Sequence, residues 1–126
     1  MNNITITGNL TRDPELKFGA VIGTAIVKLG VAVTRKVKEE EQTSFFDVVA
    51  FGSLAENIGQ SLHKGYRVTV GGRLEQRTWE TEKGEKRSTV EIVADDVAAS
   101  LRFNSLDVRS STTQGKRTER LIEDAF

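Results

Sequence analysis

The stretch from Thr43 to Lys64 constrains the fold of this chain most, because its hydrophobic period changes once, at a glycine. Before Gly52 the apolar residues follow the two-residue period of a strand. After Gly52 they follow the period of a helix, with an apolar stripe formed by Leu54, Ala55, Ile58 and Leu62. The stretch therefore predicts a strand, a one-glycine corner and a helix of about three turns.

Signals at both ends support the helix. Ser53 and Glu56 have the spacing of a capping box, in which the hydroxyl accepts a hydrogen bond from a first-turn amide and the carboxylate accepts one from the cap amide. Gly65 stands where a glycine commonly ends a helix.

The predicted strand has two unlike faces. One face carries only apolar residues and can be fully buried: Phe46, Val48 and Ala50. The other face places an acid among apolar residues: Phe45, Asp47, Val49 and Phe51. A carboxylate is rarely buried without a partner, so this second face is expected to be at least partly solvated.

Two more strands are predicted before this stretch. Alternation predicts one strand from Ile4 to Leu10, which ends at the turn before Pro14. A second, longer strand is predicted from Val21 to Thr34. The run from Arg35 to Gln42 is almost entirely polar or charged, so it is expected to be a solvated, mobile hairpin tip.

Two strands are also predicted after the helix. The first begins at Tyr66 and continues to Trp79, with Gly71-Gly72 marking a bulge or a close approach of two backbones. A turn is predicted at Lys83-Gly84. The inward set of the fifth strand is expected to be Ser88, Val90, Ile92 and Ala94, after Tyr66, Val68, Val70 and Leu74 on the fourth. Leu101 and Phe103 are expected to close the core.

The predicted order is three strands, one helix and two strands, which is the plan of the all-β, five-stranded barrel called the OB-fold. We assign residues 1–103 to this domain. Residues 104–120 are rich in Ser, Thr, Arg and Gln, and residues 104–126 are expected to form a flexible tail. The tail ends in a tip that is both acidic and apolar.

Composition excludes several kinds of site. With 18 basic and 18 acidic residues among 126, bulk charge does not favour a polyanion, so any nucleic-acid site needs local clustering. Cysteine is absent, which excludes disulfides and thiolate zinc sites. His63, the only histidine, is predicted to lie at the end of the helix, which argues against a Ser/His/Asp triad. We expect no enzymatic activity, no cofactor and no metal. The chain start has no signal-peptide pattern, and a cytoplasmic location is expected.

What remains is an arrangement of aromatic and cationic residues. Parity predicts that Phe45, Phe51 and Trp79 face outward, with Arg73 and Arg77 on the side of Trp79. Aromatic faces stack on bases while cations contact phosphates, so this pattern favours sequence-independent binding of single strands. Further cations are predicted on the turn after the first strand, along the second strand and in the hairpin run that follows it: Arg12, Lys17, Lys28, Arg35, Lys36 and Lys38. The pattern leaves one alternative open, in which the two phenylalanines are core and Trp79 caps the barrel end.

Five motifs occur in one order along the chain: Ile6-Thr7-Gly8-Asn9-Leu10, Asp13-Pro14-Glu15-Leu16, the run from Phe46 to Asn57, Lys64-Gly65-Tyr66-Arg67-Val68, and the run from Gly71 to Trp79. Together they resemble the bacterial single-stranded DNA-binding proteins over residues 2–103. Glu85-Lys86-Arg87 and Ser100-Leu101-Arg102-Phe103 are most similar to actinobacterial members, which points to an actinobacterium or its phage as the source.

The resemblance implies an OB-fold, a homotetramer, and coating of single-stranded DNA in replication, recombination and repair. It implies that Phe45, Phe51 and Trp79 stack on bases, and we expect phosphate contacts from Lys17, Arg35, Lys36, Arg73 and Arg77. It also implies that the C-terminal tip docks partner proteins through Glu123, Asp124, Ala125 and Phe126.

The chain departs from the family pattern in three places. No aromatic residue stands around Arg35-Lys36-Val37, the tip lacks a run of aspartates and a proline, and the linker is short. Asp47 needs a cationic neighbour on a phosphate-binding face, and we expect Arg73 or Arg77. Two other functions stay open: a primosome-type OB-fold adaptor that acts through protein contacts, and a metal-dependent nuclease.

Overall fold

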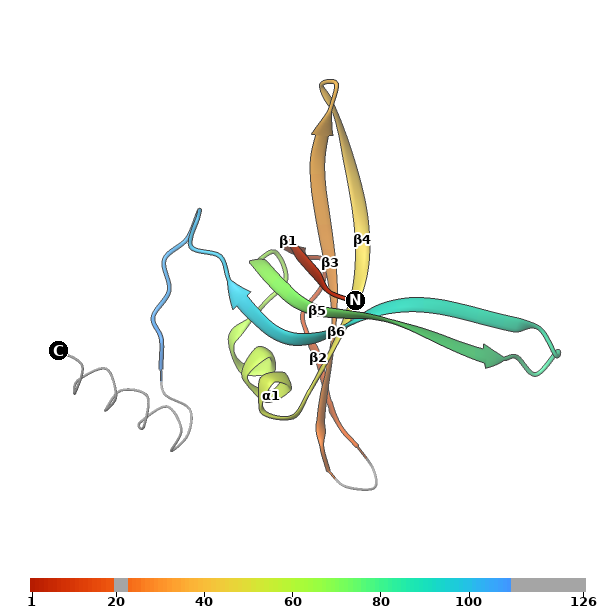
Figure 1. Cartoon of the computed structure of the whole chain (residues 1–126). Helices are drawn as coiled ribbons and strands as arrows, with labels where there is room; N and C mark the ends of the chain where they lie inside the picture. Colours follow the sequence, from red (N-terminus) through yellow and green to blue (C-terminus); the bar gives the residue numbers. More distant parts are fainter. Residues whose placement is uncertain (20–22, 110–126) are drawn as a thin grey trace.

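The computed structural model describes residues 1–19 and 23–109 (Figure 1). In these residues six strands and one helix follow one another as β1 (Ile4–Leu10), β2 (Glu15–Phe18), β3 (Ala25–Val37), β4 (Glu40–Phe51), α1 (Gly52–Ser61), β5 (Arg67–Glu80) and β6 (Lys86–Ala99). The order of strands in the sheet is β1-β5-β6-β4-β3-β2, and β1 also pairs with β3. This last pairing closes β1, β5, β6, β4 and β3 into a barrel, so the predicted OB-fold is confirmed.

The closing contacts are short. β1 meets β3 only at Asn9 opposite Ala32 and Leu10 opposite Val31. β4 and β6 form the parallel pair of the barrel, with Val48 opposite Ile92. The other strand pairs are antiparallel. The barrel is therefore a mixed sheet that closes around one core.

Alternation builds that core. Every second residue of β3, β4 and β5 points inward, and the largest fully buried side chains are Val27, Leu29, Val31, Val48, Val68, Val70 and Ile92. Ala55 and Ile58 of α1 are buried against the same cluster, as predicted from the apolar stripe. Burial of this kind stabilises the fold by roughly 25 cal/mol per Å² of apolar surface, so the helix is held by its packing.

The helix ends differ from the prediction. α1 begins at Gly52 and its N-cap is Phe51, which makes no side-chain cap hydrogen bond. The capping box is therefore wrong, because Ser53 already lies inside the first turn. Gly65 lies beyond the C-cap, Leu62, in the turn that leads to β5. There it has a φ of 89° and donates a backbone hydrogen bond to Leu10, which fastens the helix end to β1.

The charged run from Arg35 to Gln42 is not a loop. β3 continues to Val37, β4 begins at Glu40, and Lys38 and Glu39 form the turn with φ of 50° and 69°. Positive φ at both central residues is the geometry of a two-residue hairpin turn, which lets strand pairing continue to the tip. The result is an ordered hairpin arm that leaves the barrel at the top of Figure 1.

β5 and β6 also continue beyond the barrel as a second arm, on the right of Figure 1. No layer covers this arm or the chain after β6 within the described residues, so Leu74, Val90, Leu101 and Phe103 are exposed. Their predicted burial is wrong for this reason. Phe103 instead lies beside two guanidinium groups, with Arg67 and Arg102 at 5.7 and 5.2 Å from its ring centroid.

Gly71-Gly72 marks an irregularity, as predicted. Gly71 pairs with Asp96 and Gly72 with Ala94, so Asp95 is an extra residue on β6. A β-carbon at Gly72 would overlap the carbonyl oxygen of Val93, which explains the need for glycine. β2 is not evident from the sequence, because four residues are too few to show a period.

Candidate nucleic-acid interface

One outer face of the sheet gathers most of the predicted site residues. Residues paired across neighbouring strands point to the same side of a sheet. Phe45 pairs with Ala32, Asp47 with Gly30, and Phe51 with Ile26, which itself pairs with Lys17 of β2. Phe45, Asp47, Phe51 and Lys17 therefore share one face, which we call the outer face.

β5 and β6 extend this face. Val49 of β4 pairs with Val93 of β6, and Val93 pairs with Arg73 of β5. Alternation from Arg73 places Arg77 and Trp79 on the same side. Val49 and Val93 are 3% and 6% exposed and form an apolar floor under the polar groups.

The three predicted stacking residues are all accessible. Phe45 is 74% exposed, Phe51 47% and Trp79 46%. Their placement outward is as predicted, and the alternative in which the phenylalanines belong to the core is wrong. Large apolar side chains left in water on one face are typical of a binding surface.

The two cations of the β3–β4 arm lie on opposite sides of the ribbon. Lys36 has the parity of Ala32 and therefore lies on the side of Phe45, whereas Arg35 lies on the other side. In the strand register of the arm, Lys36 also lies opposite Glu41. Of the predicted phosphate contacts, Lys17, Lys36, Arg73 and Arg77 share the outer face, and Arg35 does not.

A pocket of about 520 Å³ lies in the outer face beside Trp79. Five charged residues line it together with the indole: Arg12, Lys28, Asp47, Arg77 and Glu91. Arg12 and Lys28 were predicted among the further cations of the arrangement but not among the phosphate contacts, and Glu91 had no predicted role. Parity on β3 and β6 was a usable signal for Lys28 and Glu91, but Arg12 lies off the strands, where parity says nothing.

Arg12 enters the pocket because residue 30 has no side chain. A β-carbon at Gly30 would lie 2.9 Å from Nη1 of Arg12 and would also meet the hydroxyl of Thr11. The backbone N–H of Thr11 donates to the carbonyl of Gly30 at 2.9 Å, which holds the turn against β3. Since Gly30 pairs with Asp47, the Arg12 guanidinium lies over the position opposite this acid.

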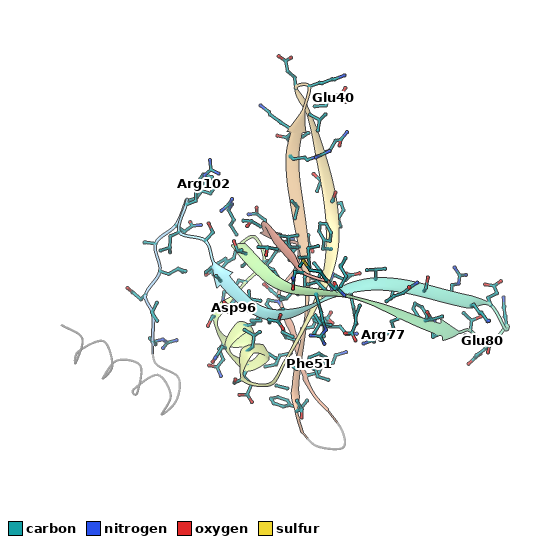
Figure 2. All side chains as sticks on the ribbon, viewed as in Figure 1. Glu40, Phe51, Arg77, Glu80, Asp96 and Arg102 are labelled. Atoms are coloured by element: carbon teal, nitrogen blue, oxygen red, sulfur yellow. The ribbon has the colours of Figure 1, made fainter. Side chains whose placement is uncertain are left out.

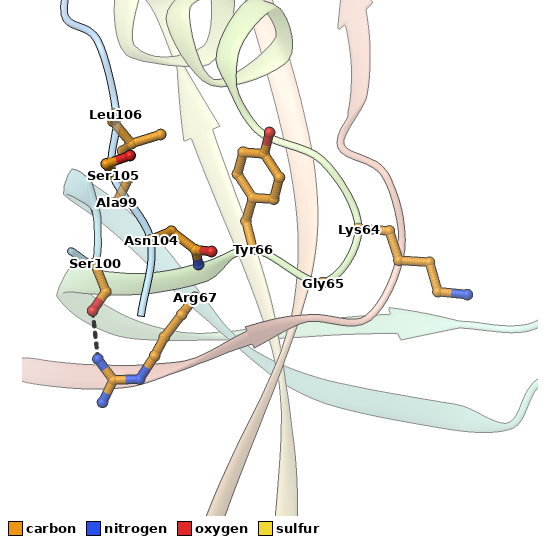
Figure 3. A pocket seen from close by; sticks show the side chains of 9 residues that line it. All are labelled: Lys64, Gly65, Tyr66, Arg67, Ala99, Ser100, Asn104, Ser105 and Leu106. Carbon is orange, nitrogen blue, oxygen red and sulfur yellow. Dashed lines mark hydrogen bonds between the residues drawn. The ribbon is translucent and has the colours of Figure 1, made fainter. Parts of the chain in front are cut away.

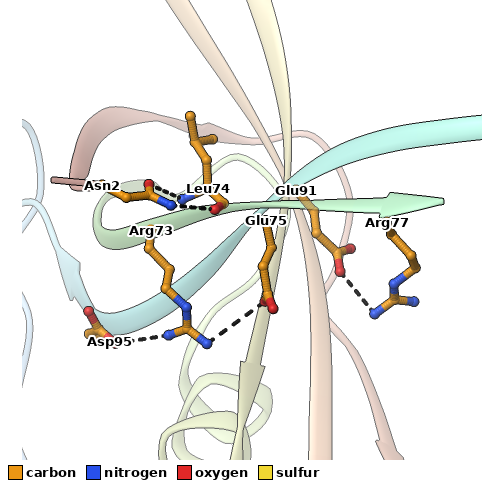
Figure 4. A network of polar contacts seen from close by, with 7 residues as sticks. All are labelled: Asn2, Arg73, Leu74, Glu75, Arg77, Glu91 and Asp95. Carbon is orange, nitrogen blue, oxygen red and sulfur yellow. Dashed lines mark hydrogen bonds and ion pairs between the residues drawn. The ribbon is translucent and has the colours of Figure 1, made fainter.

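The other arginines of the face are already engaged (Figure 4). Arg77 Nη2 lies 2.9 Å from a carboxylate oxygen of Glu91, whose side chain is only 15% exposed. Arg73 lies 3.8 Å from Glu75 and 3.9 Å from Asp95, and all three side chains are about half exposed or more. The expected pairing of Asp47 with Arg73 or Arg77 is wrong. In the described part of the chain, no cation lies within 4 Å of Asp47.

A second pocket, of about 360 Å³, holds none of the predicted site residues (Figure 3). It lies between the chain after β6 and the residues Tyr66 and Arg67, and Arg67 donates a hydrogen bond to Ser100 there.

The predicted tip residues Glu123, Asp124, Ala125 and Phe126 fall outside the described residues. Across residues 1–19 and 23–109, three or more possible metal ligands do not gather anywhere, and α1 is too short to span a membrane.

Comparison with known proteins agrees with this geometry. The model of the "Single-strand binding protein family" matches residues 1–100. A "Single-stranded DNA-binding protein" of Mycobacterium leprae is 40% identical over 119 residues, which cover 89% of this chain and 70% of the relative. The protein of that name from Corynebacterium glutamicum is 42% identical over 120 residues, which cover 90% of this chain and 53% of the relative.

The counterpart from Mycobacterium tuberculosis H37Rv is 39% identical over 119 residues, covering 89% of this chain and 72% of the relative. These relatives are actinobacterial, as the motifs predict. The family match covers the whole barrel, including the strands that form the outer face. The chain therefore belongs to the single-strand binding protein family.

Proposed function

We propose that the protein binds single-stranded DNA through the outer face, by stacking bases on Phe45, Phe51 and Trp79. The observation that carries this proposal is that three exposed aromatic side chains share one face with cationic groups. Stacking tolerates any base, because every base has a flat face, and it contributes about 1–3 kcal/mol per base. The names of the actinobacterial relatives support the same ligand. The family is one of binding proteins rather than enzymes.

The exposed cations around the pocket support a path for single-stranded DNA across it. Arg12, Lys17, Lys28 and Lys36 are exposed, and none of them is in an ion pair within the described residues. These cations are available for phosphates, although the chain as a whole is neutral. Duplex DNA hides the base faces, so we expect the same surface to prefer single strands.

The β3–β4 arm and the β5–β6 arm both extend from the strands that form the outer face. Figure 2 shows Phe51 at the barrel, Arg77 near the start of the β5–β6 arm, and Glu40 and Glu80 toward the arm ends. Phe45 and Phe51 are six residues apart on β4, roughly 20 Å along a strand. That separation lets one strand of DNA contact both rings and the pocket between them.

The cellular role follows from this activity. We propose that the protein coats single strands during replication, recombination and repair, in the cytoplasm. We also propose that residues 1–103 form the binding domain and residues 104–126 a tail, whose tip at Glu123, Asp124, Ala125 and Phe126 docks partner proteins. Deleting residues 121–126 is expected to leave DNA affinity intact and abolish partner capture; loss of DNA affinity would contradict this division.

We propose that the assembly is a homotetramer. β1 supports self-association, because over Ile4–Gly8 it pairs with β5 on one side and with no other described strand on the other. An unpaired strand edge offers backbone hydrogen bonds to a second chain. Sedimentation of the full chain tests the proposal, and a monomer at micromolar concentration would contradict it.

Titration of Trp79 fluorescence tests the binding proposal. Poly-dT is expected to quench the indole strongly, and duplex DNA of equal phosphate concentration only weakly. The titration is then repeated at two salt concentrations, and binding is expected to be weaker at the higher concentration. Equal quenching by duplex and single strand would contradict the proposal.

A further inference from the structure

Asp47 is a charged residue of the pocket to which the proposed function gives no role. It projects from the outer face of β4, is exposed, and lines the same pocket as Trp79. The second carboxylate of the pocket, Glu91, is held by Arg77 at 2.9 Å. Asp47 has no such partner within 4 Å among the described residues, so its two oxygens are free to accept hydrogen bonds.

A free carboxylate on this face disfavours phosphates. Two like charges about 4 Å apart repel by about 1 kcal/mol even in water, and by more at a protein surface. Away from the ends of a DNA strand, the groups that donate hydrogen bonds to a carboxylate are the N–H groups on base edges. Trp79 and Asp47 line the same pocket, so a base that stacks on the indole is within reach of the carboxylate, while Arg12 and Lys28 on the pocket wall suit the backbone phosphates.

The four bases differ in what they offer a carboxylate. Guanine has two adjacent donors, N1–H and the N2 amino group, which match the two oxygens of one carboxylate. Cytosine and adenine offer one amino group each. Thymine offers only N3–H between two carbonyl oxygens, and those oxygens repel a carboxylate.

We propose that Asp47 reads the Watson–Crick edge of the base stacked at Trp79 and favours guanine over thymine in the pocket. The inference rests on the proposed binding of single-stranded DNA by this face, and it adds a preference to binding that otherwise tolerates any sequence. Phosphate contacts position the strand, and this one base contact biases which nucleotide occupies the pocket.

Competition for one labelled dT oligomer tests the proposal on the full chain. The competitors are unlabelled oligomers of roughly 12 nucleotides, a length within the site size of an OB-fold. They are an alternating thymine–guanine oligomer, the same oligomer with inosine for guanine, and all-thymine. Inosine lacks only the 2-amino group, so it removes one donor and leaves the ring to stack. The guanine oligomer is expected to compete about fivefold better than the inosine oligomer.

Asp47→Asn is expected to reduce that ratio to near one, because an amide presents one acceptor instead of two. Glu82→Gln is the matched control: it also removes one negative charge, but from the exposed turn region of the β5–β6 arm. It is expected to raise affinity for every oligomer slightly and keep the guanine-to-inosine ratio.

Equal competition by the guanine and inosine oligomers in the unmutated protein would overturn the proposal. A guanine advantage that persists in Asp47→Asn would overturn it as well. Failure of the labelled dT oligomer to bind at all is a different result, because it would contradict the binding of single strands itself.

Discussion

Arg12 lies where a side chain at residue 30 would otherwise be: its Nη1 atom is 2.9 Å from the position of a β-carbon on Gly30. This relationship brings a cation from the turn after β1 onto a face built by other strands. It also places that cation over the residue that pairs with Asp47. The composition of the pocket thus depends on the absence of a single methyl group.

Gly30→Ala is expected to displace Arg12 and Thr11 and to destabilise the fold by about 1–3 kcal/mol, the usual cost of forcing a methyl group into a packed site. Urea unfolding measures the loss, and oligo-dT titration measures the accompanying drop in affinity. The double variant with Arg12→Ala is the control. Since each change removes the same contact, their effects on affinity are expected to be less than additive; full additivity would contradict the displacement.

Trp79→Ala is expected to weaken oligo-dT binding by about 1–3 kcal/mol, because one base loses its stacking surface. Anisotropy of a labelled oligomer measures the change without using the indole. Phe103→Ala is the matched control, since Phe103 is also an exposed aromatic residue but follows β6 and lies beside Arg67 and Arg102, which are not among the residues of the outer face named above. Equal losses in the two variants would show that the outer face has no special role.

Glu91→Gln is expected to free Arg77 for a phosphate. The plot of log affinity against log salt is then expected to steepen by about 0.7, the value for one additional phosphate contact on a single strand. Glu75→Gln provides the comparison, because its contact with Arg73 is longer, 3.8 Å, and more exposed. Exposed pairs of that kind contribute about 0–1 kcal/mol, so its slope is expected to change little. Identical slopes in all three proteins would contradict the role given to Glu91.

Glu39→Gly is expected to stabilise the β3–β4 arm. Glu39 has a φ of 69°, and a residue other than glycine in this conformation carries roughly 1 kcal/mol of strain. Hydrogen exchange of the amides of residues 35–42 is the suitable measurement, because the arm lies outside the barrel core. Slower exchange in Glu39→Gly, and faster exchange in the control Glu41→Gly, is the expected pair of results. Rapid exchange of these amides in every variant would indicate that the charged run is a loop after all.

Local periodicity was enough to predict much of this fold. Two-residue alternation identified the core face of the long strands and placed Phe45, Phe51 and Trp79 on the surface. The change of period at Gly52 located the helix. These predictions succeeded because alternation is a property of neighbouring residues, and the order of elements then left the OB-fold as the natural closure.

Predictions that depended on the exact end of an element failed. The capping box at Ser53 is wrong because the first helical residue is Gly52. The charged hairpin tip is a paired ribbon, because Lys38 and Glu39 adopt positive φ and composition alone does not reveal this. Alternation predicted that Val90 is buried, and Phe103 was expected to close the core, but burial requires a covering layer, and the described residues provide none at either position.

The sequence by itself determined the helix, the core parts of the long strands, the outward parity of the aromatic residues and the family. Only the tertiary structure decided which charges meet. Arg77 pairs with Glu91, Arg12 lies over Gly30, which is the residue paired with Asp47, and Arg35 lies on the other side of its arm. The physical reason is that parity is set within one strand, whereas contacts between charges depend on register across strands and on the closure of the barrel, which join residues far apart in the chain.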